Sequence, residues 1–378
     1  INLYFKKPTS IIFPLFVLQI MKKTRSVILG SGSYLPDYSR PNSYFENSEF
    51  YNPDGSKFPS DIKEIVSKFH AITGIEERTV LNSDMHTSDM GTIASQNAIK
   101  AAGINKEEID QIIVAHNFGD TGAENSTPNQ MPTIASKIKN KLGIKNENCI
   151  PYDLVFGCPG WIQAMIQADV YIKSGYAKTC LVVGAEALSR MTDPYDRDSM
   201  IFSDGAGAVI LSAVESEEEI GILQHSAMSH TQNELDYLTM GTSFHNPDPN
   251  HKFIKMNGRK IYNYALSNVP RAIKTCIDKS NLDLSDISKI LIHQANEKMD
   301  LAIGERLFSL YGIDKMPAEK MPMNIAKMGN NSVATVPILF DMIMKNELDS
   351  HSFSPSDVLI MASVGAGMSI NAFSYRLP

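Results

Sequence analysis

The chain has 378 residues, of which 43% are hydrophobic, so it can bury a large core as one long α/β domain or as two fused halves. Its formal net charge is -7, and this lack of a basic excess argues against a nucleic-acid partner, although a local Lys/Arg patch could dock an acidic protein. Four cysteines without a Cys-x-x-Cys pair argue against a disulfide framework and against a structural metal site.

The first twenty residues stand apart from the rest. An apolar run from Ile11 to Ile20, interrupted by Pro14, is too short to span a bilayer. The basic stretch that starts at Met21 follows it, where a secretory signal would have a small-residue cleavage site. We expect residues 1–20 to be a non-native upstream extension before a start at Met21, with a signal-like segment as the alternative. We therefore expect a cytoplasmic protein with no membrane partner.

From Ser26 onward, short apolar runs alternate with amphipathic stretches. The apolar runs predict strands at Val27–Gly30, Ile112–Ala115, Cys180–Gly184, Ala208–Leu211, Ile290–Ile292 and Val358–Met361. Helical spacing of apolar residues predicts helices at Thr87–Ala102, Ile162–Lys173, Ile261–Ile277 and Val333–Met344. Strands that alternate with helices of this length indicate βαβ units in a layered α/β architecture.

A weak internal repeat suggests two related halves. Asp204–Leu211 and Val364–Ile370 each read as a Gly-x-Gly turn that enters an apolar strand. We interpret residues 21–213 as the N-terminal half and residues 214–378 as the C-terminal half.

One of the four cysteines lies where reactive thiols are found. Cys158 follows an apparent strand and precedes the helix predicted from Ile162, with Pro159 in the first turn. A helix N-terminus stabilises a thiolate, and a thiol pKa shifted from about 8.5 to about 7 raises the ionised fraction more than tenfold at neutral pH. The plain alternative is an inert buried cysteine. That interpretation suits the other three, which lie in apolar or helical contexts: Cys149, Cys180 and Cys276.

Two further polar residues follow buried segments. His293 leaves the strand predicted at Ile290–Ile292, which places it at the rim of a pocket or, alternatively, in the core against a carbonyl. Asn330 lies in a glycine turn before a helix, where asparagine is usually an N-cap. Asn331 or Ser332 could instead fill that capping role and leave Asn330 free.

These motifs, taken in chain order, resemble those of the beta-ketoacyl-[acyl-carrier-protein] synthase III family. The resemblance covers nearly all of the chain from Met21 to Leu377 and includes Thr73–Ile75, Gly157–Gly160, Asp204–Ala208, His293–Asn296 and Gly329–Asn330. It implies a thiolase-like fold of two pseudo-symmetric halves in a layered α/β/α/β/α body.

The resemblance also implies roles for individual residues in a decarboxylative Claisen condensation. Cys158 would carry the acyl group, and the backbone amides of Cys158 and Ala366 would hold the oxyanion. His293 and Asn330 would hydrogen-bond the malonyl thioester as carbon dioxide leaves. The family uses no metal or redox cofactor. Its members act on acyl and malonyl thioesters, work with acyl carrier protein, and form homodimers.

The substrate channel of the family maps onto this chain only in part. Arg197, Gly258, Tyr262 and Asn296 match positions of the pantetheine or coenzyme A tunnel. We therefore expect that the tunnel is retained.

Several positions depart from the family pattern, including Phe156 and Pro159 beside the nucleophile and three positions of the expected substrate sites. Lys68 and Ile72 stand where a tryptophan and an arginine clamp the adenine, which favours a carrier-protein thioester or an atypical donor over a coenzyme A primer. Met131 matches the phenylalanine that a dimer partner contributes to the floor of the acyl pocket. Methionine is more pliable and permits a longer or branched chain. These departures make a ketosynthase for aryl-lipid or resorcinol products the leading alternative.

Further enzyme classes share this fold and fit the residues less well. A biosynthetic thiolase needs a second cysteine near the C-terminus, which Gly365–Gly367 does not provide. A hydroxymethylglutaryl-CoA synthase needs a glutamate base, for which Glu124 and Glu186 are candidates. A non-catalytic partner subunit would typically lack the nucleophile, and a plain thioesterase would not need the histidine and asparagine pair.

Overall fold

A computed structural model describes residues 22–122 and 128–378. The predictions made for residues 1–20 and for Glu124 lie outside this range. All the predicted strands and helices are present, and the helix at Thr87–Ala102 has the predicted bounds. Within the described ranges, no helix combines the length and apolarity needed to cross a bilayer.

The first sheet is built from the N-terminal half of the chain. Its order is β1–β9–β8–β4–β7, and its strands are β1 (Lys23–Tyr34), β4 (Gln111–His116), β7 (Ile150–Val155), β8 (Thr179–Ala187) and β9 (Asp204–Ser216). Strands β1, β9 and β8 pair antiparallel, whereas β4 is parallel to both β8 and β7. Strand β7 therefore lies at an edge of the sheet.

The second sheet repeats this pattern. Its order is β10–β15–β14–β13, with strands β10 (Gly221–Ser229), β13 (Ile287–Ile292), β14 (Val358–Gly365) and β15 (Ser369–Arg376). Again two antiparallel pairings are followed by a parallel one. The connection from β9 to β10 follows closely after the predicted half boundary at residue 213.

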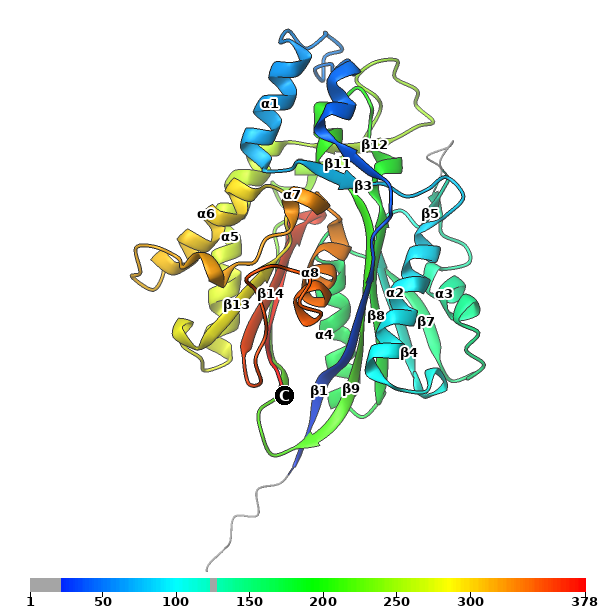
Figure 1. The fold of residues 1–378 in the computed structure, drawn as a ribbon, viewed down its shortest axis with the longest axis vertical. Helices are drawn as coiled ribbons and strands as arrows, with labels where there is room; N and C mark the ends of the chain where they lie inside the picture. Colours follow the sequence, from blue (N-terminus) through cyan, green and yellow to red (C-terminus); the bar gives the residue numbers. More distant parts are fainter. Residues whose placement is uncertain (1–21, 123–127) are drawn as a thin grey trace, which may run out of the picture.

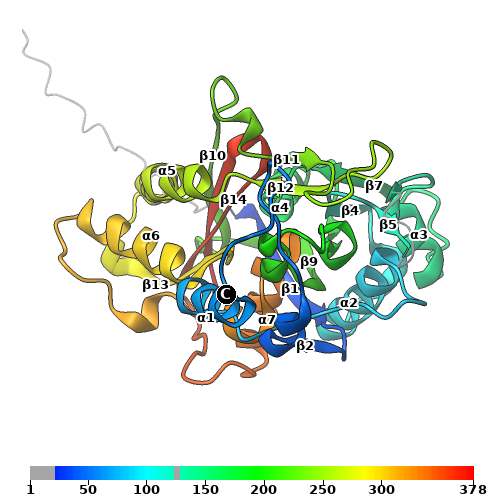
Figure 2. The same ribbon diagram turned by 90° about the horizontal axis from the view of Figure 1, so that it is seen from above.

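Helices fill the space between the two sheets and cover their outer faces (Figure 1). The central pair is α4 (Gly160–Lys173) and α8 (Thr335–Met344), whose apolar residues form one core cluster with both sheets. Helices α2 (Thr87–Ala102) and α3 (Ile134–Leu142) cover the first sheet, and α5 (Gly258–Lys279) and α6 (Glu297–Ser309) cover the second. Figure 2 shows the same succession from above, which gives the expected α/β/α/β/α layering.

Smaller elements surround this body. They include β2 (Ser39–Pro41), β3 (Glu77–Thr79), β5 (Asp120–Thr121), β6 (Pro128–Asn129), β11 (Leu238–Gly241), β12 (Phe253–Met256), α1 (Ile62–Thr73), α7 (Ile325–Met328) and several 3-10 turns.

One predicted turn is a strand instead. Residues 204–207 do not form a turn before β9 but lie inside it, where all four pair with β8 and the last two also pair with β1. The glycines serve packing, because a methyl group at Gly207 would lie 2.7 Å from the Pro337 side chain on α8. The counterpart at Gly365–Gly367 is a turn between β14 and β15, as predicted.

Candidate active site

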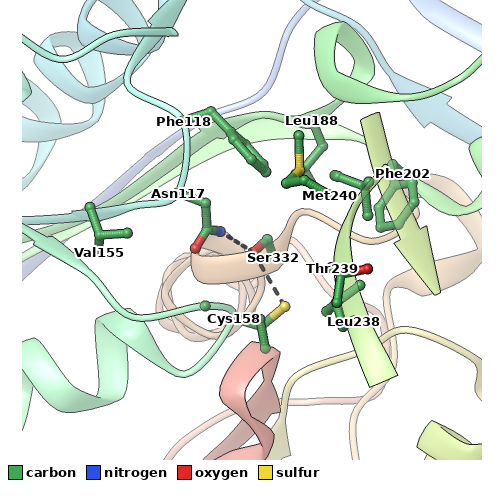
Figure 3. A pocket seen from close by; sticks show the side chains of 13 residues that line it. Asn117, Phe118, Val155, Cys158, Leu188, Phe202, Leu238, Thr239, Met240 and Ser332 are labelled. Atoms are coloured by element: carbon green, nitrogen blue, oxygen red, sulfur yellow. Dashed lines mark hydrogen bonds between the residues drawn. The ribbon is translucent and has the colours of Figure 1, made fainter. Parts of the chain in front are cut away.

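Cys158 lies in the short connection between β7 and α4. Gly157 adopts a positive φ of 70°, and its carbonyl accepts the Gly160 amide, which turns the chain into the helix. The cysteine borders a cavity of about 260 Å³ (Figure 3). Apart from Cys158 itself, most of the lining is apolar: Phe118, Val155, Leu188, Phe202, Leu238, Met240, Ile254 and Ala366, together with Asn117, Gly157, Thr239 and Ser332.

The prediction that the helix N-terminus lowers the pKa of the Cys158 thiol is wrong. Burial is the largest influence and raises the pKa of Cys158 to about 11, and the charge of Glu186 adds to the increase. A hydrogen bond from Ser332 opposes it. The helix N-terminus is in place, but the loss of water around the sulfur outweighs its effect. The other three cysteines are buried and form no disulfide, as expected.

His293 follows β13, as predicted, and its amide donates to the Ala362 carbonyl of β14 over 2.9 Å. The ring is 6% exposed, and burial lowers its pKa to about 4, although hydrogen bonding to the Ser332 main chain raises it slightly. The imidazole is therefore neutral at pH 7. Its Nδ1 is buried and forms no hydrogen bond with any described residue, so the main-chain contact expected of a core histidine satisfies only one of the two ring nitrogens.

Asn330 follows Gly329, which has a positive φ of 58°. Its main chain is fixed by hydrogen bonds with Ile201 and Ser203. Its Oδ1 accepts the Ser332 amide over 2.8 Å. Neither of the proposed caps acts as one, because no side-chain cap is formed at the start of the following helices and Asn331 donates to the Asp204 carbonyl instead. The Asn330 side chain is thus held in place through its oxygen, and its Nδ2 donates to none of the described residues.

Ser332 connects the three predicted site residues. Its hydroxyl donates to the Cys158 sulfur over 3.4 Å, its amide donates to Asn330, and its main chain interacts with His293. The sequence pattern pointed to Ser332 only as a helix cap. The available signal was its place at the end of Gly329–Ser332, immediately before an apolar helix.

A buried glutamate lies behind this junction. Asn117 donates to the Ser332 hydroxyl over 3.2 Å, as drawn in Figure 3, and its side-chain and backbone amides both donate to Glu186 over 2.7 Å. Glu186 is fully buried, and desolvation raises its pKa to about 7. From the sequence, Glu186 was considered only as a candidate glutamate base of a hydroxymethylglutaryl-CoA synthase. In the structure Glu186 is linked to the thiol through Asn117 and Ser332, and its charge raises the thiol pKa.

The predicted oxyanion amides lie on two loops in close contact. A methyl group at Gly365 would lie 2.5 Å from the Cys158 nitrogen, and one at Gly157 would lie 2.9 Å from the Ala366 nitrogen. Glycine at both positions therefore allows the loops to meet. Neither amide donates a hydrogen bond to another residue in the part of the chain that the structure describes. Both amides remain available to a substrate oxygen, and their role in holding the oxyanion stays a prediction.

The four predicted tunnel residues lie outside the Cys158 cavity. The Arg197 guanidinium stacks on Phe58 with 4.8 Å to the ring centroid. Asn296 caps α6 by accepting the Met299 amide. Gly258 and Tyr262 lie exposed at the start of α5, and a methyl group at Gly258 would meet open space. Their role in binding pantetheine stays a prediction.

The three departing positions of the expected substrate sites lie at the surface. Lys68 on α1 forms an exposed ion pair with Glu64, and Ile72 on the same helix is exposed. Met131 is 89% exposed and borders a different, polar hollow with Asp120. Within this single chain, Met131 therefore does not reach the Cys158 cavity.

Both parts of the chain match known proteins. The family description of 3-oxoacyl-[acyl-carrier-protein (ACP)] synthase III matches residues 152–231, and that of its C-terminal part matches residues 277–377. The beta-ketoacyl-[acyl-carrier-protein] synthase III of Ehrlichia canis is 33% identical over 348 residues, covering 91% of this chain and 97% of the relative. That of Staphylococcus saprophyticus is 34% identical over 350 residues, covering 92% and 98%.

Solved structures show the same similarity. The 3-oxoacyl-[acyl-carrier-protein] synthase III of Aquifex aeolicus is 28% identical, has a TM-score of 0.75, and covers 93% of this chain and 99% of its own. A priming beta-ketosynthase from a polyketide biosynthetic pathway is 26% identical, has a TM-score of 0.75, and covers 96% and 99%. The chain is thus a condensing acyltransferase with a thiolase-like fold, and it belongs to the beta-ketoacyl-[acyl-carrier-protein] synthase III family.

Proposed function

We propose that this protein condenses an acyl thioester with malonyl-acyl-carrier protein to give a beta-ketoacyl product, in fatty-acid initiation or a related pathway. The observation that carries the proposal is the junction at Ser332, which contacts the Cys158 sulfur and also binds Asn330 and His293. A nucleophile and two polar residues from the other half of the chain thereby share contacts with Ser332, which lines the Cys158 cavity, although His293 and Asn330 are not among the lining residues.

In the first half-reaction, the Cys158 sulfur attacks the carbonyl carbon of the acyl thioester. The carbon–sulfur bond to Cys158 forms, the bond to the carrier thiol breaks, and that thiol leaves with a proton. The free amides of Cys158 and Ala366 suit the tetrahedral oxyanion, and such a donor is typically worth about 3–4 kcal/mol in the transition state.

In the second half-reaction, a malonyl thioester loses carbon dioxide and becomes an enolate. Neutral His293 and the unused amide of Asn330 would hydrogen-bond the enolate oxygen. The enolate carbon then attacks the acyl carbonyl, the new carbon–carbon bond forms and the bond to the Cys158 sulfur breaks. The departing thiolate takes up a proton from solvent, which regenerates the thiol. A neutral imidazole suits this role, because it donates a hydrogen bond without the cost of a buried positive charge.

The raised thiol pKa makes deprotonation a distinct step in this scheme. With a pKa of about 11, almost all of the thiol is protonated at neutral pH. Acylation therefore requires a proton acceptor as the thioester arrives. His293 is neutral and carries an unpartnered buried ring nitrogen, so it is the group that we assign to this task.

Surface features support the proposed partners. Strand β7 lies at one edge of the first sheet, with Ile150 and Val155 exposed on it, and Met131 is exposed shortly before α3, the helix that contacts β7. These apolar groups suit a homodimer in which Met131 enters the partner's acyl pocket. Exposed cations adjoin the predicted tunnel residues and suit an acidic carrier protein: Arg259, Lys260 and Lys298. The cytoplasmic location and the half boundary at residue 213 stay predictions.

The decisive experiment separates the two half-reactions. Purified protein is incubated with acyl thioesters on carrier protein and on coenzyme A, and intact mass is measured. We expect an acyl adduct that disappears in Cys158→Ala. The His293→Ala and Asn330→Ala variants should lose decarboxylation of malonyl-carrier protein. An adduct that persists without Cys158 would overturn the assignment of the nucleophile, and decarboxylation that survives in both other variants would overturn their roles.

A further inference from the structure

A second cavity lies next to the one at Cys158. Its volume is about 460 Å³. Its lining includes three arginines and no aspartate or glutamate, together with several hydroxyl and apolar groups: Arg40, Tyr44, Phe45, Ser48, Arg78, Val80, Leu81, Ser189, Arg190, Thr192, Pro194, Ser199, Phe202 and Phe253. We call it the arginine chamber.

The chamber and the Cys158 cavity share a wall. Phe202 lines both of them, and consecutive residues face opposite sides, with Leu188 on the Cys158 cavity and Ser189 on the chamber. In the same way, Ile254 faces the Cys158 cavity and Phe253 the chamber. Figure 3 shows Phe202 across the cavity from the Cys158 sulfur. An acyl chain that leaves the sulfur in the direction of Phe202 would meet this wall.

The positive charge in the chamber is only partly neutralised by the protein. Arg78 is 1% exposed, and its guanidinium donates to the carbonyls of Met200 and Arg40 and to the side chain of Asn42. Burial lowers its pKa to about 10, so it remains charged at neutral pH. Neither Arg78 nor Arg40 forms an ion pair with a carboxylate of the described chain. Arg78 feels the charge of Glu77 without an ion pair, and Arg190 feels the charges of Asp204 and two other carboxylates.

Two donors in the lining lack a partner. The Nε of Arg40 and the Oγ of Ser199 are both buried, and neither forms a hydrogen bond with a described residue. The Arg40 guanidinium otherwise lies over the Tyr44 ring, 4.8 Å from its centroid. A buried donor without an acceptor is costly, and in a cationic cavity the acceptor that suits it is an oxyanion.

We propose that the arginine chamber binds a carboxylate, and that this is the distal carboxylate of an acyl donor whose thioester end reacts at Cys158. The inference rests on the proposed function and specifies its substrate class as a dicarboxylic acid esterified to the thiol at one end. Displacement of the Phe202 side chain would join the two cavities. Arg40 and Ser199 would supply the missing hydrogen bonds, and Arg78 the charge.

The test compares matched donors on the full-length protein. Acylation of Cys158 is followed by intact mass with succinyl-, adipyl- and suberyl-pantetheine and with their methyl-ended counterparts, butyryl-, hexanoyl- and octanoyl-pantetheine. We expect at least one dicarboxylic donor to react faster than its counterpart. Arg40→Gln should lower that rate ratio by about tenfold, since a charge-assisted hydrogen bond is lost. Ser199→Ala should lower it by a smaller factor, and Arg271→Gln, at an exposed arginine of α5, should leave it unchanged.

A second arm measures free anions. Inorganic phosphate and glutarate are titrated by calorimetry into wild-type protein and Arg40→Gln, a measurement that does not involve the thiol. Binding that Arg40→Gln abolishes, without any preference for dicarboxylic donors, would overturn the assignment of the distal carboxylate. If wild-type protein neither binds the free anions nor prefers dicarboxylic donors, the arginine chamber is not an anion site. If no donor acylates Cys158, the proposed function is wrong. The anion titration still tests whether the arginine chamber binds an anion, because it does not depend on the thiol.

Discussion

The Ser332 hydroxyl lies 3.4 Å from the Cys158 sulfur and donates a hydrogen bond to it, although 174 positions separate the two residues. Cys158 belongs to the half of the chain that builds the first sheet, and Ser332 precedes α8 in the other half. This contact therefore joins the two halves at the nucleophile.

The first prediction concerns this hydrogen bond. Because it favours the thiolate, Ser332→Ala should raise the Cys158 pKa further and slow alkylation by iodoacetamide at a fixed pH. A hydrogen bond of about 1 kcal/mol corresponds to a decrease of about fivefold. The Ser332 amide, which holds Asn330, is retained. Ser309→Ala removes an exposed hydroxyl on α6 as the control, and an identical pH–rate profile in the two variants would contradict the prediction.

The second prediction concerns Glu186. Its charge raises the Cys158 pKa, so Glu186→Gln should lower that pKa and accelerate alkylation above pH 7, where Glu186 is ionised. In wild-type protein the alkylation rate should still be rising at pH 9, because the thiol titrates at about 11. A rate that levels off near pH 7 would restore the sequence-based expectation of an activated thiol. Glu347→Gln, at an exposed carboxyl, serves as the control.

The same glutamate predicts a pH dependence of stability. Its pKa in the folded protein is about 7, above the ordinary value of 4.5, so the folded state favours the protonated form. The contribution is fully present below pH 4.5 and is lost as the pH rises through 7, by about 3 kcal/mol in total. Glu186→Gln lacks this loss. The free energy of unfolding is measured with urea at pH 5 and pH 8. Relative to wild type, that of the variant should be higher at pH 8 than at pH 5, and a difference that is the same at both pH values would contradict the prediction.

Local sequence sufficed for the elements that place the three site residues. Cys158 lies in a glycine turn between a strand and a helix, and His293 directly follows a buried strand. Apolar periodicity and turn residues determine such features within a short window. The helix at Thr87–Ala102 shows this most clearly, since its predicted bounds are those observed.

What the sequence could not provide depends on distant partners. The thiol pKa is raised mainly by burial, which depends on how distant segments fold around the sulfur, and this effect outweighs the nearby helix N-terminus. The role of Ser332 depends on a contact across 174 positions. The arginine chamber gathers Arg40, Arg78 and Arg190 from three separate segments. None of these distances can be derived from local periodicity.

The third prediction concerns the oxyanion loops. Gly365→Ala places a methyl group 2.5 Å from the Cys158 nitrogen and 2.9 Å from its Cβ, so the loop must move. We expect a loss of stability of about 2 kcal/mol and loss of Cys158 acylation in protein that remains folded. Circular dichroism establishes the folded fraction, and intact mass measures the adduct. Normal acylation by a folded variant would show that this close approach is not required.

The fourth prediction uses a glycine with free space around it. A methyl group at Gly258 meets nothing within 4 Å, and the residue begins α5, so Gly258→Ala should fold and be at least as stable as wild type. If Gly258 lines the pantetheine tunnel, the variant should show a higher KM for the thioester with little change in kcat. Thermal unfolding and steady-state kinetics separate the two effects. An unchanged KM would remove Gly258 from the tunnel.

The fifth prediction concerns Met131, which is 89% exposed in the single chain and does not line the cavity of its own Cys158. If it enters the acyl pocket of a second protomer, its size sets the space available to the acyl chain. Met131→Ala should shift acylation toward longer donors, and Met131→Trp should shift it toward shorter ones, each by several-fold. Acylation rates over a series of straight-chain thioesters measure the shift, and Tyr176→Ala, at another exposed apolar residue, is the control. A chain-length profile that is the same in all four proteins, or a protein that elutes as a monomer in size-exclusion chromatography, would contradict this role, because the methionine can act only across a dimer interface.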